Sequence, residues 1–403
     1  MILGAALVGI GAIVAGHNAL KQFAYSWLLG FMFCFSLCGG ALFLVIVHHL
    51  FDAGWSVAIR RFCEHIASLF FPCLAILFLP IAILAPTIYK WMSPIAQHQH
   101  AVKAKLPLFT KPGFYITAAI CFGVWWLLSN RLRYWSLEQD KTGGAKPTLR
   151  MRFFSCIGIV LFALTFTLGA VMWMKALQYE WFSTMYGVYY FAGSVWTTLA
   201  TAYVITMILD RQGVLSDALH EHQYYFLGSL MFAFTVFYAY VTFAQYFIIW
   251  NGNMPEETFW YVLREKGSWW YIGMVIIFGH FFVPFLSLLR IDVKHKFPIM
   301  APLCVWAWLM HYLDLSFNIM PELHPNGFML HWMDLGCWCF MIGVLSWRFL
   351  KEYAAHAPYP IKDPRLIEAM GHFHPVPTQL SGGELGEVDD LRDAPPQFRG
   401  GVR

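Results

Sequence analysis

The chain has 403 residues, of which 59% are hydrophobic and 12% are charged. Soluble domains average about 25% charged residues, and a water-facing surface needs more charge than 27 Lys+Arg and 23 Asp+Glu residues supply. This composition excludes a soluble globular fold, a disordered chain and a disulfide-rich secreted scaffold, and it indicates a polytopic membrane protein. The net charge of +4 is small and no Lys/Arg cluster is interleaved with aromatic residues, so nothing predicts a nucleic-acid partner.

Ten stretches are apolar enough to be read as membrane-spanning helices, each of which needs about 20 residues. The first is the shortest, but it lacks the basic start and the cleavage pattern of a signal peptide, so we take it as a span. The sequence therefore predicts an all-α polytopic membrane domain over residues 1–350. In chain order its spans are residues 2–19, 24–51, 65–86, 112–129, 152–174, 187–209, 222–250, 269–290, 297–320 and 329–350.

A weak internal repeat suggests how these helices group. Residues 29–33 are similar to residues 186–190, and small residues follow both segments. The repeat favours two four-helix bundles, spans two to five and six to nine, with two flanking helices.

The distribution of basic residues predicts the orientation of the chain in the membrane. The connections on one side of the ten spans carry fourteen Lys and Arg residues, and those on the other side carry eight. The richer side is expected to be cytoplasmic, which places both termini inside. Residues 351–403 are predicted to form a cytoplasmic tail that docks on a partner with its first half and is disordered towards its end. Aromatic residues gather on the outer side, where they are expected to anchor the protein among lipids.

The cysteine and histidine patterns indicate that this chain itself holds no cofactor. None of the nine cysteines forms a CxxC pair, and a CxxCH sequence is missing, so we expect no zinc site, haem c or iron–sulfur cluster on it. His280 and His311 lie well inside spans eight and nine. A bis-histidine haem between them remains an alternative.

Ionisable residues inside predicted spans point to proton transfer, because such groups are costly in a membrane and usually serve a function. Asp314 lies one helical turn from His311, so the two are expected to form an outer proton-exchange pair, directly or through one water. From there a route would continue through residues near the midplane towards groups at the inner side. The candidates, from outside to inside, are His311, Asp314, Gln245, Asp334, His280, Tyr238, Thr201, Glu64, His65 and Asp210.

Structural explanations of the same residues stay open. A Thr in a membrane helix often bonds only to its own backbone. Asp314 and His311 can equally form a structural ion pair, and His280 can be a hydrogen-bonded core residue.

Four sequence runs carry a resemblance to a known family. WFSTMYGVYYFAGS begins at Trp181, QYFIIWNGNMPEET at Gln245, MHYLDL at Met310 and DPRL at Asp363. In this order they resemble the second polysulfide-reductase-type (NrfD/PsrC-like) membrane subunits of alternative complex III, the ActF type. The resemblance covers about residues 20 to 370.

This resemblance implies a subunit of a quinol:cytochrome c or quinol:electron-acceptor oxidoreductase in the inner (cytoplasmic) membrane of a bacterium. Haem c and iron–sulfur clusters would belong to multihaem cytochrome c and iron–sulfur partner subunits. A sister NrfD-like membrane subunit would hold the quinol site, while menaquinone or another quinone is a candidate ligand here. The positions that match polar family residues are Gln245, Tyr246, His311, Tyr312 and Asp314.

Three functions compete at this point. The first is a membrane subunit that couples quinol oxidation to proton translocation. The second is a scaffold that holds the haem and iron–sulfur subunits and carries no protons. The third, a secondary transporter, is disfavoured because Pro80 and Pro284 do not occupy matching places in the two halves.

Overall fold

The structure is a computed structural model that describes residues 1–15, 18–216 and 218–370. The described residues form helices and no strand. The long helices are α1 (Ile2–Ala15), α2 (Ala19–Leu50), α3 (Val57–Ser68), α4 (Ala75–Ile88), α7 (Lys111–Thr142), α8 (Ala145–Trp173), α9 (Tyr186–Arg211), α10 (Glu221–Gly252), α14 (Phe297–Ile319) and α15 (Trp332–Ala354). The shorter helices are α5 (Pro94–Gln97), α6 (His100–Lys103), α11 (Pro255–Arg264), α12 (Trp269–Ile276), α13 (Val283–Leu288) and α16 (Leu366–Ala369).

Nine helical segments of the described chain are long and apolar enough to cross a membrane, which confirms the polytopic, all-helical class. The first predicted span, residues 2–19, does not reach that length within its described residues. Its counterpart α1 has 14 residues, about 21 Å at 1.5 Å per residue, and a span needs about 20 residues. Met1 lies against Gly343, about halfway along α15, so α1 covers only part of that helix.

Small residues let α1 approach α15 closely. A Cβ atom on Gly4 would lie 2.5 Å from the backbone nitrogen of Phe340, and one on Gly336 would lie 2.8 Å from that of Val8. Two helices with glycine at their contact can pack backbone to backbone, the usual arrangement between helices in lipid. These glycine contacts therefore hold α1 on α15 although α1 is short.

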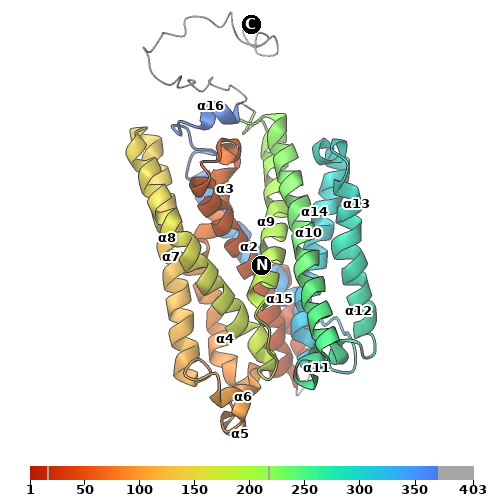
Figure 1. Cartoon of the computed structure of the whole chain (residues 1–403). Coiled ribbons are helices and arrows are strands. Elements are labelled where there is room, and N and C mark those ends of the chain that lie inside the picture. Colours follow the sequence, from red (N-terminus) through yellow and green to blue (C-terminus); the bar gives the residue numbers. More distant parts are fainter. Residues whose placement is uncertain (16–17, 217, 371–403) are drawn as a thin grey trace, which may run out of the picture. The chain divides into compact units, whose positions relative to one another are not determined.

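The helices fall into two groups that meet at α2 and α9 (Figure 1). Helices α2, α3, α4, α7 and α8 contact one another, and α9, α10, α12, α13 and α14 form the second group. These groups correspond to predicted spans two to five and six to nine. α15 and α1 pack in turn on α2, and α2 and α9 are the most deeply buried helices.

Two of the spanning segments contain π-helical turns where prolines interrupt the regular hydrogen bonding. The segment that joins α3 to α4 is η3 (Phe70–Leu74), with Pro72 inside it and Phe71 in an extended conformation. The segment that joins α12 to α13 is η6 (Ile277–Phe282), and Pro284 is the second residue after it. A π-helical turn frequently marks a functional position in a helix, and His280 lies in the second one.

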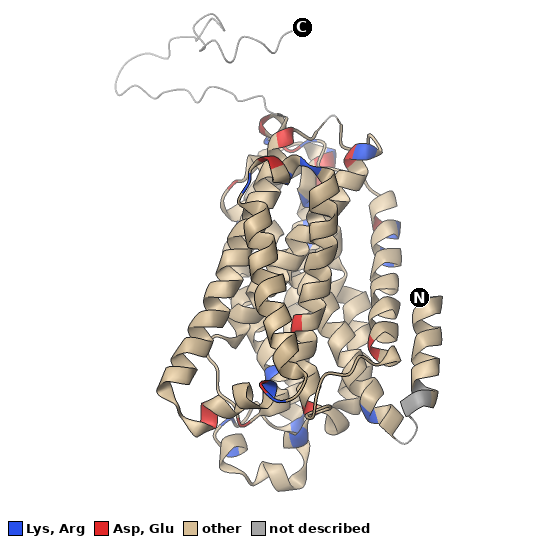
Figure 2. Cartoon of the chain, turned by 90° about the vertical axis from the view of Figure 1, so that its right-hand side faces the viewer, with Lys and Arg blue, Asp and Glu red and all other residues tan. Residues whose placement is uncertain are grey.

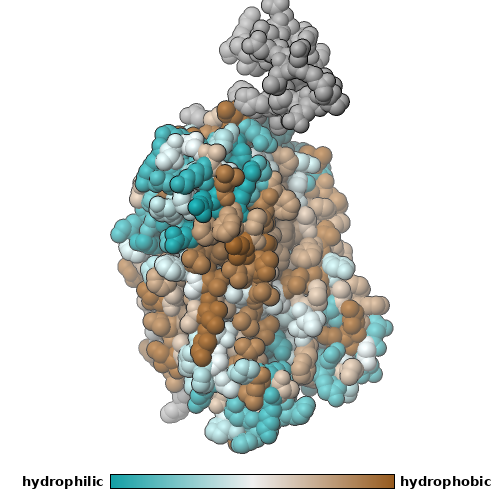
Figure 3. Space-filling view, turned by 60° about the vertical axis from the view of Figure 1, so that its left-hand side comes forward, coloured by the Kyte–Doolittle hydropathy of each residue, from teal (hydrophilic) through white to brown (hydrophobic). Residues whose placement is uncertain are grey.

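The surface of the described chain suits a membrane. An apolar belt lies between two polar ends in the view of Figure 3, and charged residues gather at those ends in Figure 2.

The C-terminal segment packs on the helices at one of these ends, where Leu366 and Ala369 of α16 contact Val57 and Ala58. The described part of the predicted tail, residues 351–370, therefore packs on the helical body, because its apolar residues are buried on α3. A domain boundary at residue 351 stays a prediction. The predicted disorder falls on residues 371–403, outside the described residues.

Candidate functional site

Asp314 is a buried carboxylate held by tyrosines. It is 3% exposed and lies on α14, and the structure places no Lys, Arg or His of the described chain within ion-pairing distance of it. The hydroxyls of Tyr238 on α10, at 2.8 Å, and of Tyr189 on α9 both donate to its Oδ1 atom. Its Oδ2 atom has no hydrogen-bond partner among the described residues. A carboxylate in this setting can bind and release a proton at that free oxygen.

Asn318 extends this site towards the end of the bundle that carries α11. Its side-chain amide donates at 2.8 Å to the Tyr189 hydroxyl, and its carbonyl accepts from Tyr186 at 3.1 Å. Asp314 is thus linked to Tyr186 through Tyr189 and Asn318. Such hydrogen-bonded hydroxyl and amide groups can orient a proton donor or acceptor at the carboxylate.

His280 lies directly behind Tyr238. Its imidazole is sandwiched between the rings of Tyr238 and Trp196, with centroids 3.8 Å and 4.0 Å away. The side chain is fully buried, and neither ring nitrogen has a hydrogen-bond partner in the described chain. An unpartnered buried imidazole is costly, so a role that needs its free nitrogens is favoured over simple packing.

The expected direct pair of His311 and Asp314 is absent. His311 Nε2 lies 3.0 Å from the Ser36 hydroxyl on α2, and Ser36 donates to the Phe33 carbonyl at 2.7 Å. Nε2 is therefore assigned as the protonated nitrogen, which leaves Nδ1 as an acceptor without a partner next to Gly193. The two residues diverge by about 60° around α14, since three residues rotate the helix by about 300°. A link through water stays a prediction.

Four other predicted residues lie in separate networks. Thr201 bonds to the Thr197 carbonyl, as the structural explanation expects, and accepts from Trp308. Gln245 bonds to Ser183 and Tyr261 near α11, while Asp210 accepts from Tyr224. Asp334 caps the first turn of α15 and accepts from Ser26 of α2 at 2.5 Å. None of these hydrogen bonds joins the cluster around Asp314.

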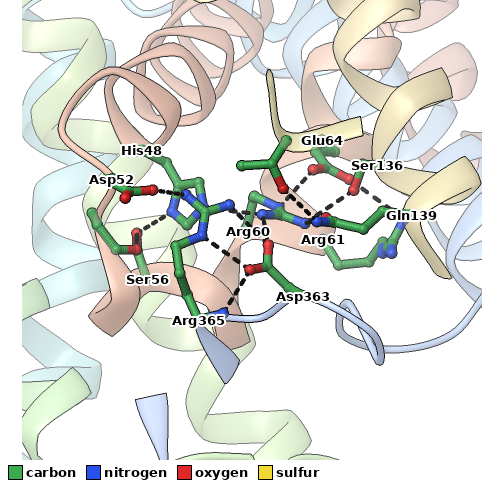
Figure 4. Close-up of polar contacts among 12 residues, drawn as sticks. His48, Asp52, Ser56, Arg60, Arg61, Glu64, Ser136, Gln139, Asp363 and Arg365 are labelled. Carbon is green, nitrogen blue, oxygen red and sulfur yellow. Dashed lines mark hydrogen bonds and ion pairs between the residues drawn. The ribbon is translucent and has the colours of Figure 1, made fainter. Parts of the chain in front are cut away.

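A second buried polar cluster lies at the opposite end of the helices (Figure 4). Arg60 of α3 contacts Glu64 one turn later at 2.9 Å and Asp363 of the C-terminal segment at 2.5 Å. Arg61 contacts Glu64 at 3.5 Å and also pairs with Asp140 of α7. The predicted third span begins too late at residue 65, because these charged residues read as a loop in the sequence but neutralise one another inside α3.

The DPRL run forms the cover of this cluster. Arg365 donates to both oxygens of Asp363 at 2.9 Å and reaches Asp52 at the same distance. Burial alone would raise the pKa of Asp363, but Arg60 and Arg365 outweigh it and hold that pKa well below its usual range. Asp363 is therefore a fixed anion at neutral pH and unsuited to carry protons.

His48 completes the cluster from α2. Its Nε2 accepts from Arg60 at 3.0 Å, since a guanidinium has no acceptor, and its Nδ1 therefore donates to Ser56 at 2.6 Å. His65 lies nearby with both nitrogens buried and unpartnered, its ring 5.4 Å from that of His356. Glu64 and His65 are thus at one end of the structure, and no hydrogen bond of the described residues connects them to His280.

The structure adds residues that sequence reasoning missed: Tyr189, Trp196, Arg60 and Asp363 as members of the two clusters. Tyr186 and Tyr189 are three residues apart at the start of α9, and this spacing was the sequence signal that could have identified them.

In the part of the chain that the structure describes, no group of three His, Cys, Asp or Glu residues is placed to hold a metal ion. No protein-family model matches the chain, and no curated protein matches it significantly.

Proposed function

We propose that this chain is the proton-handling membrane subunit of a quinol-oxidising electron-transfer complex of the NrfD/PsrC-like type. The observation that carries the proton-handling role is Asp314, a buried carboxylate with two tyrosine donors and no cationic partner among the described residues. The four sequence runs that resemble alternative complex III carry the rest of the proposal. In this function the complex oxidises quinol in a bacterial inner membrane, and this chain links that reaction to proton movement.

In this function Asp314 is the central exchange group of the outer half. A proton binds the free Oδ2 of Asp314, while Tyr189, oriented by the amide of Asn318, donates to Oδ1 and holds the carboxylate in place. The two tyrosine donors stabilise the ionised state, while burial favours the neutral state, so the carboxyl group can alternate between them. Tyr238 bonds to Asp314 and stacks on His280, which makes His280 the next group inward.

The inner half begins at the arginine cluster. Glu64 is the carboxylate of this cluster that belongs to the predicted route, and both nitrogens of His65 beside it have no partner among the described residues. Glu64 is held by Arg60 and Arg61, so we assign it to neutralising the charge of these two arginines. His65 is then the inner exchange group.

The resemblance supplies the proposed partners. An iron–sulfur subunit and multihaem cytochrome c subunits would bind on the α11 side, and a sister NrfD-like subunit in the membrane plane would oxidise the quinol. This chain needs no haem or cluster of its own for the proton role. A quinone on this chain is not required either.

A scaffold is the second candidate function. It is favoured by the aromatic core around Phe35, which contacts Phe70, Trp125, Phe166 and Trp173 at centroid distances of 4.8–6.0 Å. Such a core makes a rigid platform on which other subunits can assemble. Under this alternative, Asp314 only ties α14 to α9 and α10.

The Asp314→Asn variant separates the two functions in the assembled complex reconstituted in vesicles. Asn keeps the size of the side chain and can accept from both tyrosines, but it cannot exchange a proton. We expect full haem content, near-normal electron transfer when vesicles are uncoupled, and loss of the protons released per electron. Asp334→Asn is the matched control, because Asp334 is an equally buried acid that caps α15. A normal proton-to-electron ratio in the assembled Asp314→Asn complex would support the scaffold instead.

A further inference from the structure

Two lysines from distant parts of the sequence meet at the end of the molecule that carries α5, α6 and α11 (Figure 1). Lys105 lies in the connection between α6 and α7, and Lys175 begins the short helix η5 (Lys175–Gln178) that follows α8. Their ammonium nitrogens lie 4.2 Å and 5.5 Å from the centroid of the same ring, that of Phe182. Two like charges therefore share one aromatic platform.

The two ammonium groups lack an acidic partner. Lys175 is only 7% exposed and forms no ion pair with an acid of the described chain; its ammonium group contacts the ring of Phe182 and lies within hydrogen-bonding reach of Lys105. Lys105 donates to the Tyr179 carbonyl, and Glu180, the nearest acid, stays outside ion-pairing distance. Burial, and then the proximity of Lys105, lowers the pKa of Lys175 to about 7. A buried pair of this kind is costly unless an anion neutralises it.

The surroundings indicate what kind of anion fits. The pair lies directly after the end of α8, a spanning helix, and so at the edge of the membrane. Phe182 is 49% exposed, and both Leu106, which follows Lys105 in the sequence, and Met185, three residues after Phe182, are exposed as well. A ligand here meets two cations beside apolar surface, which is the chemistry of a phosphate carried on an acyl chain. Basic pockets at the ends of membrane helices bind anionic headgroups in this way.

We propose that Lys105 and Lys175, with Phe182 as the apolar contact, form a binding site for the phosphate of an anionic phospholipid. The two ammonium groups would each donate to the phosphate oxygens, and the ring of Phe182 would pack on the lipid below the headgroup. This site is separate from Asp314 and does not depend on the proposed proton function. A free phosphate ion shares the same chemistry and is distinguished by the test. A carboxylate of a partner subunit is the competing occupant.

The test uses the purified full chain, delipidated in detergent and titrated with phosphatidylglycerol under native mass spectrometry. The Lys105→Gln/Lys175→Gln double variant is compared with the Lys103→Gln variant, whose lysine is exposed in α6 of the same connection. Charged hydrogen bonds are worth about 1.5–3 kcal/mol each, so we expect at least about tenfold weaker lipid binding in the double variant. The control is expected to bind like the wild type.

Two further measurements distinguish the sources of the anion. The first is a titration with inorganic phosphate alone. If phosphate binds the wild type without any preference of the protein for phosphatidylglycerol, the two lysines form a phosphate site whose ligand is soluble phosphate. Equal lipid binding by the wild type and the double variant would overturn the proposal. So would a carboxylate–lysine cross-link from Lys175 to a partner subunit in the native complex, because the partner would then supply the anion.

Discussion

The Tyr238 hydroxyl donates a 2.8 Å hydrogen bond to the Asp314 carboxylate, while the same tyrosine ring stacks on His280 at 3.8 Å. One side chain thus connects an acid on α14 with an imidazole in the π-helical turn between α12 and α13. The hydroxyl of Tyr238 hydrogen-bonds to the carboxylate of Asp314, and the face of its ring stacks on the imidazole of His280. Removing only the hydroxyl therefore tests the acid contact and leaves the stack in place.

We expect Tyr238→Phe to lower both stability and proton coupling. Asp314 would lose one of its two donors, and a buried group that loses a hydrogen bond costs about 1–3 kcal/mol. Under the proposed function the protons released per electron should fall as well, because the link to His280 is cut. Thermal unfolding of the purified protein and proton release in vesicles measure the two effects. Tyr240→Phe on the same helix is the control, since Tyr240 is exposed, and an equal effect of both variants would contradict the assignment.

Much of the fold follows from runs of about 20 apolar residues, and these predict the spanning helices because lipid leaves few other structures possible. The late start predicted for the third span has a different cause: charges that are neutralised at a distance. Arg60 and Glu64 look like a loop in the sequence, yet Asp363, about 300 residues later, lets them lie buried in a helix. A hydropathy profile is calculated from neighbouring residues, so it carries no information about an ion-pair partner that lies far away in the sequence. The start of α3 was missed for this reason.

The candidate site was predictable in part. The predicted route continued from Asp314 to Tyr238 and His280, and in the structure Tyr238 contacts both of the other residues. Spacing along one helix was a poorer guide for His311, which faces α2 while Asp314 faces α9 and α10. The meeting of Lys105 and Lys175 depends on two connections folding together, so no local pattern indicates it.

The ion pair between Arg60 and Asp363 is expected to hold the C-terminal segment on the bundle. Asp363→Asn leaves Arg60 with one acid partner fewer, and breaking a buried pair costs about 3 kcal/mol. Limited trypsin digestion should then cleave faster after Lys362, and the unfolding temperature should fall. Asp292→Asn removes an acid of the exposed pair with Arg290 and should change neither. Unchanged cleavage in the Asp363 variant would show that apolar contacts of α16 suffice.

Gly4 is expected to decide whether α1 stays on α15. A Leu side chain at Gly4 would collide with backbone atoms of Gly336 and Phe340, which cannot move aside, whereas Gly9 has open space around it. We predict that Gly4→Leu speeds hydrogen–deuterium exchange across residues 2–11 at least about tenfold, equivalent to about 1.4 kcal/mol of lost protection. Gly9→Leu should leave the exchange unchanged. Slow exchange in both variants would mean that α1 packs by other contacts.

The stability of the lipid-free protein is expected to rise with pH between about 7 and 10 because of Lys175. Burial and the neighbouring Lys105 lower its pKa to about 7 in the folded state, whereas an exposed lysine in the unfolded chain has a pKa of about 10.4. Between these values the unfolded state binds more protons, so raising the pH favours the folded state, and the gain is complete above the unfolded pKa. Unfolding temperatures measured from pH 6 to 10 should show this rise in the wild type and a weaker one in Lys175→Met. Lys103→Met should retain the full rise, because its lysine is exposed in both states. Saturating phosphatidylglycerol should flatten the wild-type profile, since a bound phosphate restores the charged form of Lys175; a profile that is identical in Lys175→Met and the wild type would remove Lys175 as its source.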